Sequence, residues 1–141
     1  MWENQLAAAG CRVTEPRRAV MTVLAQSDVP LSPQAVMEQG QAVYPRLGLV
    51  TVYRTLELFE ELGLVERVHV REGCHGYLTI SPGHRHRLLC RECGRAVEFR
   101  GEDDLDGLLE RVETETGYRV EHHLLQLVGI CPMCRNIQSE P

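Results

Sequence analysis

Residues 48–68, GLVTVYRTLELFEELGLVERV, decide how the first half of the chain folds. Apolar residues recur there at helical spacing and predict one buried stripe: Val52, Leu56, Phe59 and Leu62. The polar residues between them are expected to face outward: Tyr53, Arg54, Glu57 and Glu61. Thr51 is expected to cap the start of this helix, and Gly63 stands where a helix ends in the left-handed conformation. The stretch therefore predicts a helix followed at once by a strand.

Two more helices are expected before this one. Thr14 with Pro16, and Ser32 with Pro33, each combine a capping side chain with a proline in the first turn. After residue 63 the runs LVERVHV and HGYLTI, separated by the turn REG at 71–73, predict a β-hairpin. Three helices followed by a hairpin is the order of elements in a winged helix-turn-helix.

The rest of the chain predicts a second, smaller α/β domain. SPG at 81–83 is a plausible hinge, and a strand then leads into Cys90. A strand at 96–100, a helix from about 102 to 116 and a strand at 119–128 precede Cys131. We therefore expect an α+β protein, with a winged-helix domain at 1–80, a hinge at 81–84 and a second domain at 85–141.

Composition limits the function classes. The chain has 43% hydrophobic and 25% charged residues and a net charge of −5, so a strongly basic nucleic-acid footprint is absent. No apolar run approaches the roughly 20 residues of a membrane span, and the first residues do not resemble a signal peptide. These features predict a cytoplasmic protein without a membrane partner.

Two C-x-x-C motifs predict a metal site. Cys90 and Cys93 are separated by 37 residues from Cys131 and Cys134. Two such turns supply the four thiolates of a tetrahedral zinc site, and four thiolates leave no coordination position open, so this zinc is expected to be structural. A redox-active pair is the rival interpretation. Gly94, directly after Cys93, favours a metal-binding turn because redox motifs normally open a helix after a strand.

Histidines predict a second metal site. His84 and His86 share one face of the expected strand, and His122 and His123 lie together on a later one. Solvated surface histidines are the alternative, but a His-x-His beside a zinc motif favours metal binding. Further candidate ligands are dispersed along the chain: His69, Cys74, His75 and Glu98.

These motifs together resemble the ferric-uptake-regulator family, whose members are metal-dependent transcriptional repressors. The resemblance extends from GCRVTEPRRAVMTVL to GICPMC, and its most specific parts are the T-V-Y-R helix start and the paired C-x-x-C motifs. It implies an N-terminal winged helix, a C-terminal dimerisation domain, and a structural Zn²⁺ held by Cys90, Cys93, Cys131 and Cys134.

The resemblance also implies two further metal sites. The positions of the hinge site hold residues that do not bind metals (Pro30, Leu78, Arg85 and Arg87), and only the acid at Glu98 remains. The positions of the other site hold potential ligands: His84, His86, Asp106 and His123. This second set implies a regulatory divalent metal, either Zn²⁺ or Fe²⁺, and manganese also fits the donors. Cys74 or His75, in the expected β-hairpin that forms the wing of the winged helix, could add a further ligand.

The expected partner is a double-stranded DNA operator of palindromic sequence, bound by a homodimer. Tyr53 and Arg54, with Thr51, lie near the end of the helix that enters the major groove, and Arg17 and Arg18 suit phosphate contacts. Two alternatives stay open: a winged-helix protein whose zinc is purely structural, and an enzyme, either a thiol oxidoreductase or a hydrolase. No nucleophile-base set or phosphate loop supports an enzyme with a small organic substrate.

Overall fold

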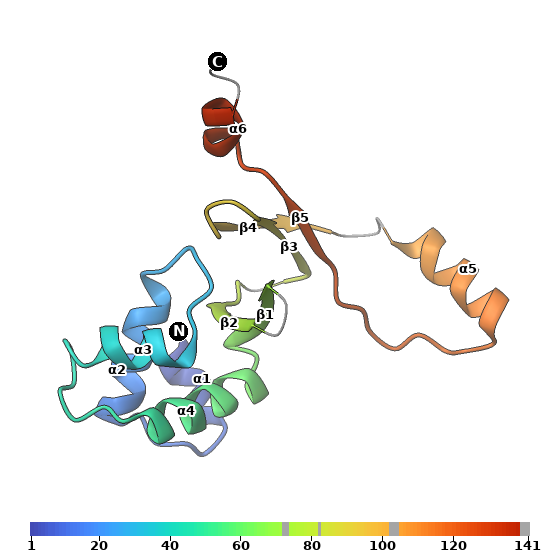
Figure 1. Ribbon diagram of the computed structural model, residues 1–141. Coiled ribbons are helices and arrows are strands. Elements are labelled where there is room, and N and C mark those ends of the chain that lie inside the picture. Colours follow the sequence, from blue (N-terminus) through green and yellow to red (C-terminus); the bar gives the residue numbers. More distant parts are fainter. Residues whose placement is uncertain (72–73, 82, 102–104, 139–141) are drawn as a thin grey trace. The chain divides into compact units, whose positions relative to one another are not determined.

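The computed structural model describes residues 1–71, 74–81, 83–101 and 105–138. The chain divides into two compact units, Met1–Ile80 and Ser81–Pro141. Within the described residues, the first unit holds four helices and a hairpin, and the second holds a three-stranded sheet and two helices (Figure 1). The predicted α+β class is confirmed.

The first unit begins with four helices, of which the second and third start at a side-chain cap. They are α1 (Trp2–Ala8), α2 (Glu15–Ala25), α3 (Pro33–Gly40) and α4 (Leu49–Glu61). The Thr14 hydroxyl accepts a hydrogen bond from the Arg17 backbone N–H at 3.4 Å, and Ser32 does the same for Ala35 at 3.1 Å. Both predicted caps are therefore confirmed. The sequence analysis missed α1, whose Leu6 is completely buried.

Helix α4 carries the predicted stripe into the core. Val52, Leu56 and Phe59 are fully buried, and Gly63 ends the segment with a φ of +68°. The expected cap at Thr51 is wrong. The helix begins at Leu49, with Gly48 as its N-cap in extended conformation and no side-chain cap bond, so Thr51 lies exposed inside the first turn.

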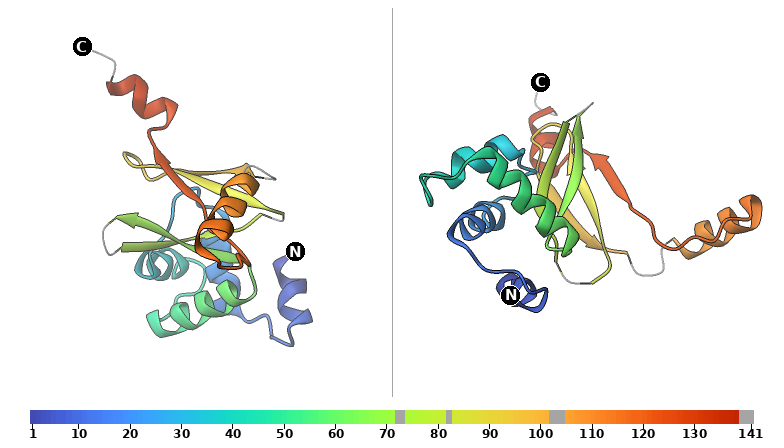
Figure 2. Two further views of the ribbon diagram at one scale, coloured as in Figure 1. Left: turned by 90° about the vertical axis from the view of Figure 1, so that its right-hand side faces the viewer. Right: turned by 90° about the horizontal axis from the view of Figure 1, so that it is seen from below.

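The hairpin of β1 (Val65–Arg71) and β2 (Cys74–Thr79), green in Figure 2, is antiparallel. Val65 lies opposite Thr79 and His69 lies opposite His75. The predicted turn falls partly on residues 72–73, which lie outside the described residues. Leu31, just before α3, forms a bridge to Tyr77 with backbone N–H to carbonyl distances of 3.1 and 2.8 Å. The hairpin is therefore fastened to the helical core as well as to α4.

The second unit is built on the sheet order β4-β3-β5. Strand β3 (Arg85–Cys90) pairs antiparallel with β4 (Ala96–Arg100) and parallel with β5 (Gln126–Gly129). The two helices are α5 (Asp106–Thr116) and α6 (Pro132–Gln138). None of the described helices is long and apolar enough to cross a membrane.

Several predicted boundaries in this unit need correction. The strand expected at 119–128 is wrong for residues 119–125, because the ladder with β3 begins only at Gln126. Alternating apolar residues favour an extended backbone, but a strand also requires a partner for its N–H and C=O groups. The expected helix start at 102–104 and residue 82 of the expected hinge lie outside the described residues.

Ser32→Ala should lower the free energy of unfolding of the first unit by about 1 kcal/mol, because the N–H of Ala35 loses its acceptor. Urea denaturation followed by circular dichroism measures the change. Ser32→Asp retains an acceptor at the cap and serves as the control. Equal losses in both variants would contradict a capping role.

Candidate metal centres

The four cysteines of the two motifs converge at one end of the sheet. Cys90 ends β3, Cys93 lies in the following turn, Cys131 directly precedes α6 and Cys134 lies in its first turn. The four sulfur atoms all lie within 4.8 Å of one another, and Cys93 Sγ is 3.8 Å from Cys131 Sγ. All are free thiols. Two motifs separated by 37 intervening residues thus form one cluster.

The local backbone explains how the first motif presents its sulfurs. Gly94 adopts a φ of +77°, and its N–H donates to the Cys90 carbonyl at 2.9 Å, which closes a tight turn around the motif. The Cys131 N–H donates to Cys90 Sγ at 3.3 Å. The tight turn that Gly94 predicted after Cys93 is therefore present.

Electrostatics in the cluster favour a bound cation. Hydrogen bonds from the backbone N–H groups of Cys93 and Cys131 lower the pKa of the Cys90 thiol to about 6. The Cys131 side chain, followed by burial, raises the pKa of Cys134 to about 12, so the crowded thiols do not all ionise together. A divalent metal supplies the positive charge that lets every sulfur bind as a thiolate. The donor set therefore fits zinc.

The second motif retains one feature of the redox alternative. Cys131 and Cys134 open a short helix directly after a strand, which is the arrangement expected of redox-active pairs. Both sulfurs, however, share the cluster with Cys90 and Cys93. Four convergent sulfurs match a metal site better than a two-sulfur redox centre.

Three histidines form a second group in the same unit. Ligand nitrogens of His84, His86 and His123 all lie within 4.8 Å of one another. His84 Nε2 and His123 Nε2 are only 3.0 Å apart, and the three rings lie with centroids 4.8–5.4 Å from each other. Two ring nitrogens at this distance can share either a proton or a metal ion. The strand expected to carry His123 is absent, and the residue instead precedes β5 in an extended segment.

His86 is the most informative member of this group. Its side chain is 3% exposed, and its Nε2 has no hydrogen-bond partner among the described residues. A buried ring nitrogen without a partner is costly unless a ligand satisfies it. The ring packs on Phe99 at 5.5 Å and against Gly101, where an added Cβ would overlap the imidazole. The sequence pattern did not single out Gly101, because its approach to His86 depends on the pairing of β3 with β4.

Other predicted ligands do not join the two groups. Asp106 begins α5 and is exposed, and His122 is also exposed and is not part of the group that its neighbour His123 joins. His69, Cys74 and His75 belong to the first unit. Among the described residues, only the three histidines and the four cysteines gather in this way.

Glu98 has a different role from the expected one. Its carboxylate pairs with Arg87 at 3.1 Å, directly across the β3–β4 ladder, and accepts a hydrogen bond from the Ser81 N–H at 3.3 Å. Burial lowers the pKa of the Arg87 guanidinium, and the Glu98 charge partly offsets that effect. Arg87 therefore supplies Glu98 with the positive charge that a metal would otherwise bring.

The candidate DNA contacts lie on the first unit. Tyr53 and Arg54 are exposed on the outer face of α4, as predicted. A shallow depression is lined by residues of α2 and α4 and the preceding cap: Thr14, Pro16, Arg17, Thr51, Arg54 and Thr55. It brings Arg17, Thr51 and Arg54 together from two helices.

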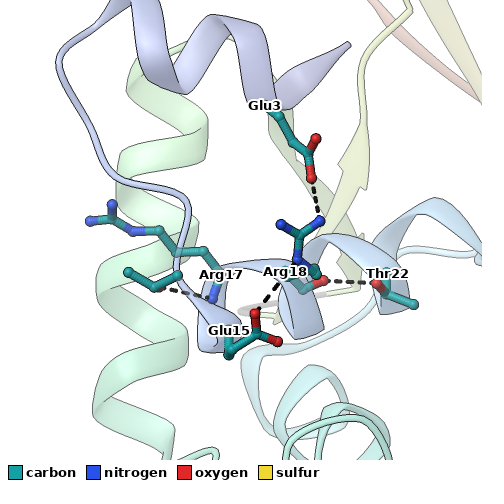
Figure 3. A network of polar contacts seen from close by, with 6 residues as sticks. Glu3, Glu15, Arg17, Arg18 and Thr22 are labelled. Atoms are coloured by element: carbon teal, nitrogen blue, oxygen red, sulfur yellow. Dashed lines mark hydrogen bonds and ion pairs between the residues drawn. The ribbon is translucent and has the colours of Figure 1, made fainter.

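Arg18 lies in a network of polar contacts at the surface of the first unit (Figure 3). Its guanidinium forms an ion pair with Glu3 of α1 and lies 3.9 Å from Glu15, and its carbonyl accepts from the Thr22 hydroxyl at 2.8 Å. Two acids near one guanidinium reduce its availability to phosphate. The Arg17 guanidinium instead donates to the Arg12 carbonyl.

A family model described as "Ferric uptake regulator family" matches residues 8–128 of this chain. The chain belongs to the ferric uptake regulator family. The ferric uptake regulation protein of Legionella pneumophila is 38% identical over 142 residues, covering 94% of this chain and 97% of that protein. The zinc uptake regulation protein of Mycobacterium tuberculosis is 34% identical over 131 residues, covering 93% of this chain and 100% of that protein.

Solved structures agree on the fold. A zinc uptake regulator complexed with zinc and DNA superimposes with a TM-score of 0.79 at 22% identity, covering 97% of this chain and 92% of that one.

Ferric uptake regulators are metal-responsive, DNA-binding repressors and not enzymes, so the oxidoreductase and hydrolase alternatives are excluded. The predicted family and fold class are confirmed.

Cys93→Ser should release the metal of the sulfur cluster and unfold the second unit, because few apolar side chains there are buried. Elemental analysis and thermal denaturation measure both effects. Cys74→Ser, at an exposed thiol of the other unit, is the control. A Cys93→Ser protein that keeps its metal and its melting temperature would refute this role.

Gly101→Ala should weaken metal binding at the histidine group at least tenfold, because the new methyl group displaces the His86 ring. Metal titration at constant cysteine-bound zinc measures the affinity. Gly107→Ala, where an added Cβ meets nothing within 4 Å, controls for a change of glycine elsewhere in the unit. Unchanged affinity in Gly101→Ala would show that His86 is not a ligand.

Proposed function

We propose that this chain is a repressor of metal-homeostasis genes, and that it binds its operator as a homodimer when a regulatory divalent metal occupies His84, His86 and His123. The observation that carries the proposal is the buried His86 Nε2, which lacks a partner among the described residues and faces two further imidazoles. The site is separate from the sulfur cluster, so the chain has one set of ligands for structure and another for sensing.

The sulfur cluster is proposed to hold Zn²⁺ permanently. Tetrahedral coordination by four thiolates leaves no position for exchangeable water or substrate. Because the cluster joins the end of β3 to α6, the ion fastens the last helix to the sheet. Its contribution is to the stability of the second unit.

Three imidazoles suit Zn²⁺ or Fe²⁺ as the regulatory metal, and Mn²⁺ is compatible. A fourth ligand completes a tetrahedron, and Asp106 remains our prediction for it, although the structure does not bring its carboxylate into the group. Asp106→Asn tests that assignment by its effect on metal affinity. The sensing ligands differ from the thiolates in being neutral bases, so the ion at this site is more readily exchanged.

The position of His84 suggests how the metal acts. His84 lies just after Ser81, the first residue of the second unit, whereas His123 precedes β5. An ion held by both restricts the segment that connects the two units. Metal binding then favours one conformation of the protein, with one placement of its DNA-reading units, over another. The size of this population shift is set by the difference between the affinities of the ion for the two conformations.

A row of exposed apolar side chains supports dimerisation through the second unit. Leu88 lies opposite Val97 in one ladder and opposite Leu127 in the other, so the three cross one face of the sheet. Their exposed fractions are 38%, 51% and 45%. Such a surface is unusual on a monomer and fits burial against a second copy of the chain.

DNA contact is proposed for the N-terminal half of α4, the second helix of the helix-turn-helix pair. Tyr53 can contact base edges or thymine methyl groups, and Arg54 and Arg17 can bind phosphates from the same depression. The net charge of −5 opposes DNA binding elsewhere on the surface, so affinity should fall steeply with salt.

His84→Ala combined with His123→Ala should abolish metal-activated DNA binding while leaving a folded dimer. Operator affinity is measured by fluorescence anisotropy with zinc, ferrous iron and manganese, and the oligomeric state by sedimentation. His122→Ala removes an exposed neighbouring imidazole and is the control. If wild-type DNA affinity is the same with and without all three metals, the zinc is purely structural and the proposed sensing role is wrong.

Arg54→Ala should weaken operator binding by about 1–3 kcal/mol, roughly a factor of 5–150, because a direct contact at the groove is lost. The control is Arg111→Ala, which removes an exposed arginine of α5 and changes the net charge by the same amount as Arg54→Ala. Equal losses in the two variants would indicate a general charge effect and would contradict a specific contact.

A further inference from the structure

A histidine pair on the hairpin of the first unit belongs to neither metal centre. His69 of β1 and His75 of β2 lie directly opposite each other in the antiparallel ladder, and both are exposed. Their ring centroids are 5.0 Å apart, with the ring planes inclined by 66°. Residues opposite each other on one face of a sheet keep this proximity because the backbone ladder fixes it.

The ring geometry of this pair matches that of the candidate regulatory centre. There, His84 and His123 have centroids 4.8 Å apart and planes inclined by 60°, and His84 and His86 are at 4.8 Å and 88°. The rings of His69 and His75, which we call the wing pair, therefore have nearly the same separation and inclination as imidazoles whose nitrogens converge. Small rotations of two exposed rings suffice to direct one nitrogen of each toward a common point.

We infer that His69 and His75 form an additional transition-metal site on the hairpin, one that binds a divalent ion through two imidazoles and water. It lies in the first unit and does not depend on the function proposed for the second. Its donors exclude Mg²⁺ and Ca²⁺, which require oxygen ligands. Zn²⁺, Cu²⁺ and Ni²⁺ all favour imidazole.

The residues around His69 and His75 determine how tightly this pair is expected to bind a metal ion. Arg67 lies two residues before His69, on the same face of β1, and its charge opposes any cation. Two imidazoles also supply fewer donors than the three of the regulatory centre. The wing site should therefore fill only at higher metal concentrations than the regulatory centre.

An ion at this place would connect the two strands of the hairpin. The ladder is irregular between His69 and Arg71, where the register shifts, so the pair is the last regular cross-strand position before that irregularity. A metal bridge there adds a link where backbone pairing is interrupted. It should slow opening of the hairpin, which exchange of backbone amide hydrogens can detect.

The test uses the full-length protein in which His84→Ala and His123→Ala have removed the regulatory centre. Zn²⁺ or Ni²⁺ alone is added, and bound metal per chain is measured by equilibrium dialysis with elemental analysis. We expect one ion above the cysteine-bound zinc. His69→Ala and His75→Ala should each lose it, and the double variant should lose no more, because one ion is shared.

His122→Ala in the same background controls for loss of an exposed imidazole and should retain the ion. Circular dichroism confirms that each variant is folded, and His75→Gln repeats the test with a polar side chain. Zinc should slow amide exchange in β1 and β2 of the parent but not of His69→Ala. The inference is overturned if His69→Ala binds as much metal as its parent, or if His122→Ala loses the ion as well. Neither outcome depends on whether His84 and His123 regulate DNA binding.

Discussion

The crowding of four sulfur atoms at the end of β3 is the constraint on which the second unit depends. Cys90 and Cys134 have opposite pKa shifts, so the cluster without a cation contains charged and neutral thiols in contact. Few other interactions stabilise the second unit, because few of its described apolar side chains are buried. A small sheet with so limited a core needs a metal, a partner subunit or both to remain folded.

Strand β3 places the two candidate centres on one face of the sheet. His86 and Cys90 are four residues apart, and side chains alternate along a strand, so both project to the same side. A structural ion in the sulfur cluster would thus hold in position the strand that carries His86. Preorganisation of this kind would let the proposed regulatory ion use its binding free energy to stabilise one conformation rather than to assemble its own site.

Local signals in the sequence were sufficient for much of the fold. The caps at Thr14 and Ser32, the stripe on α4 and the end at Gly63 are set by neighbours within one turn. The motifs likewise predicted that the four cysteines gather and that His84, His86 and His123 do so, but the expected Asp106 and His122 do not join them. The predictions that failed concern contacts between residues that are distant in sequence. Residues 119–125 alternate like a strand but form no ladder, and no short-range pattern pairs Arg18 with Glu3. The contact between Gly101 and His86 arises from pairing of β3 with β4 and has no local signature.

The ion pair between Arg87 and Glu98 gives the two faces of the sheet different chemical behaviour. On the face with the histidines, charge would change as the proposed regulatory ion binds or leaves. On the other, a guanidinium covalently attached to the chain already neutralises the carboxylate, whose oxygen also accepts from the N–H of Ser81. That neutralisation is the same in a metal-starved cell and in a replete one, so the start of the second unit is held by a cation that the protein can never lose.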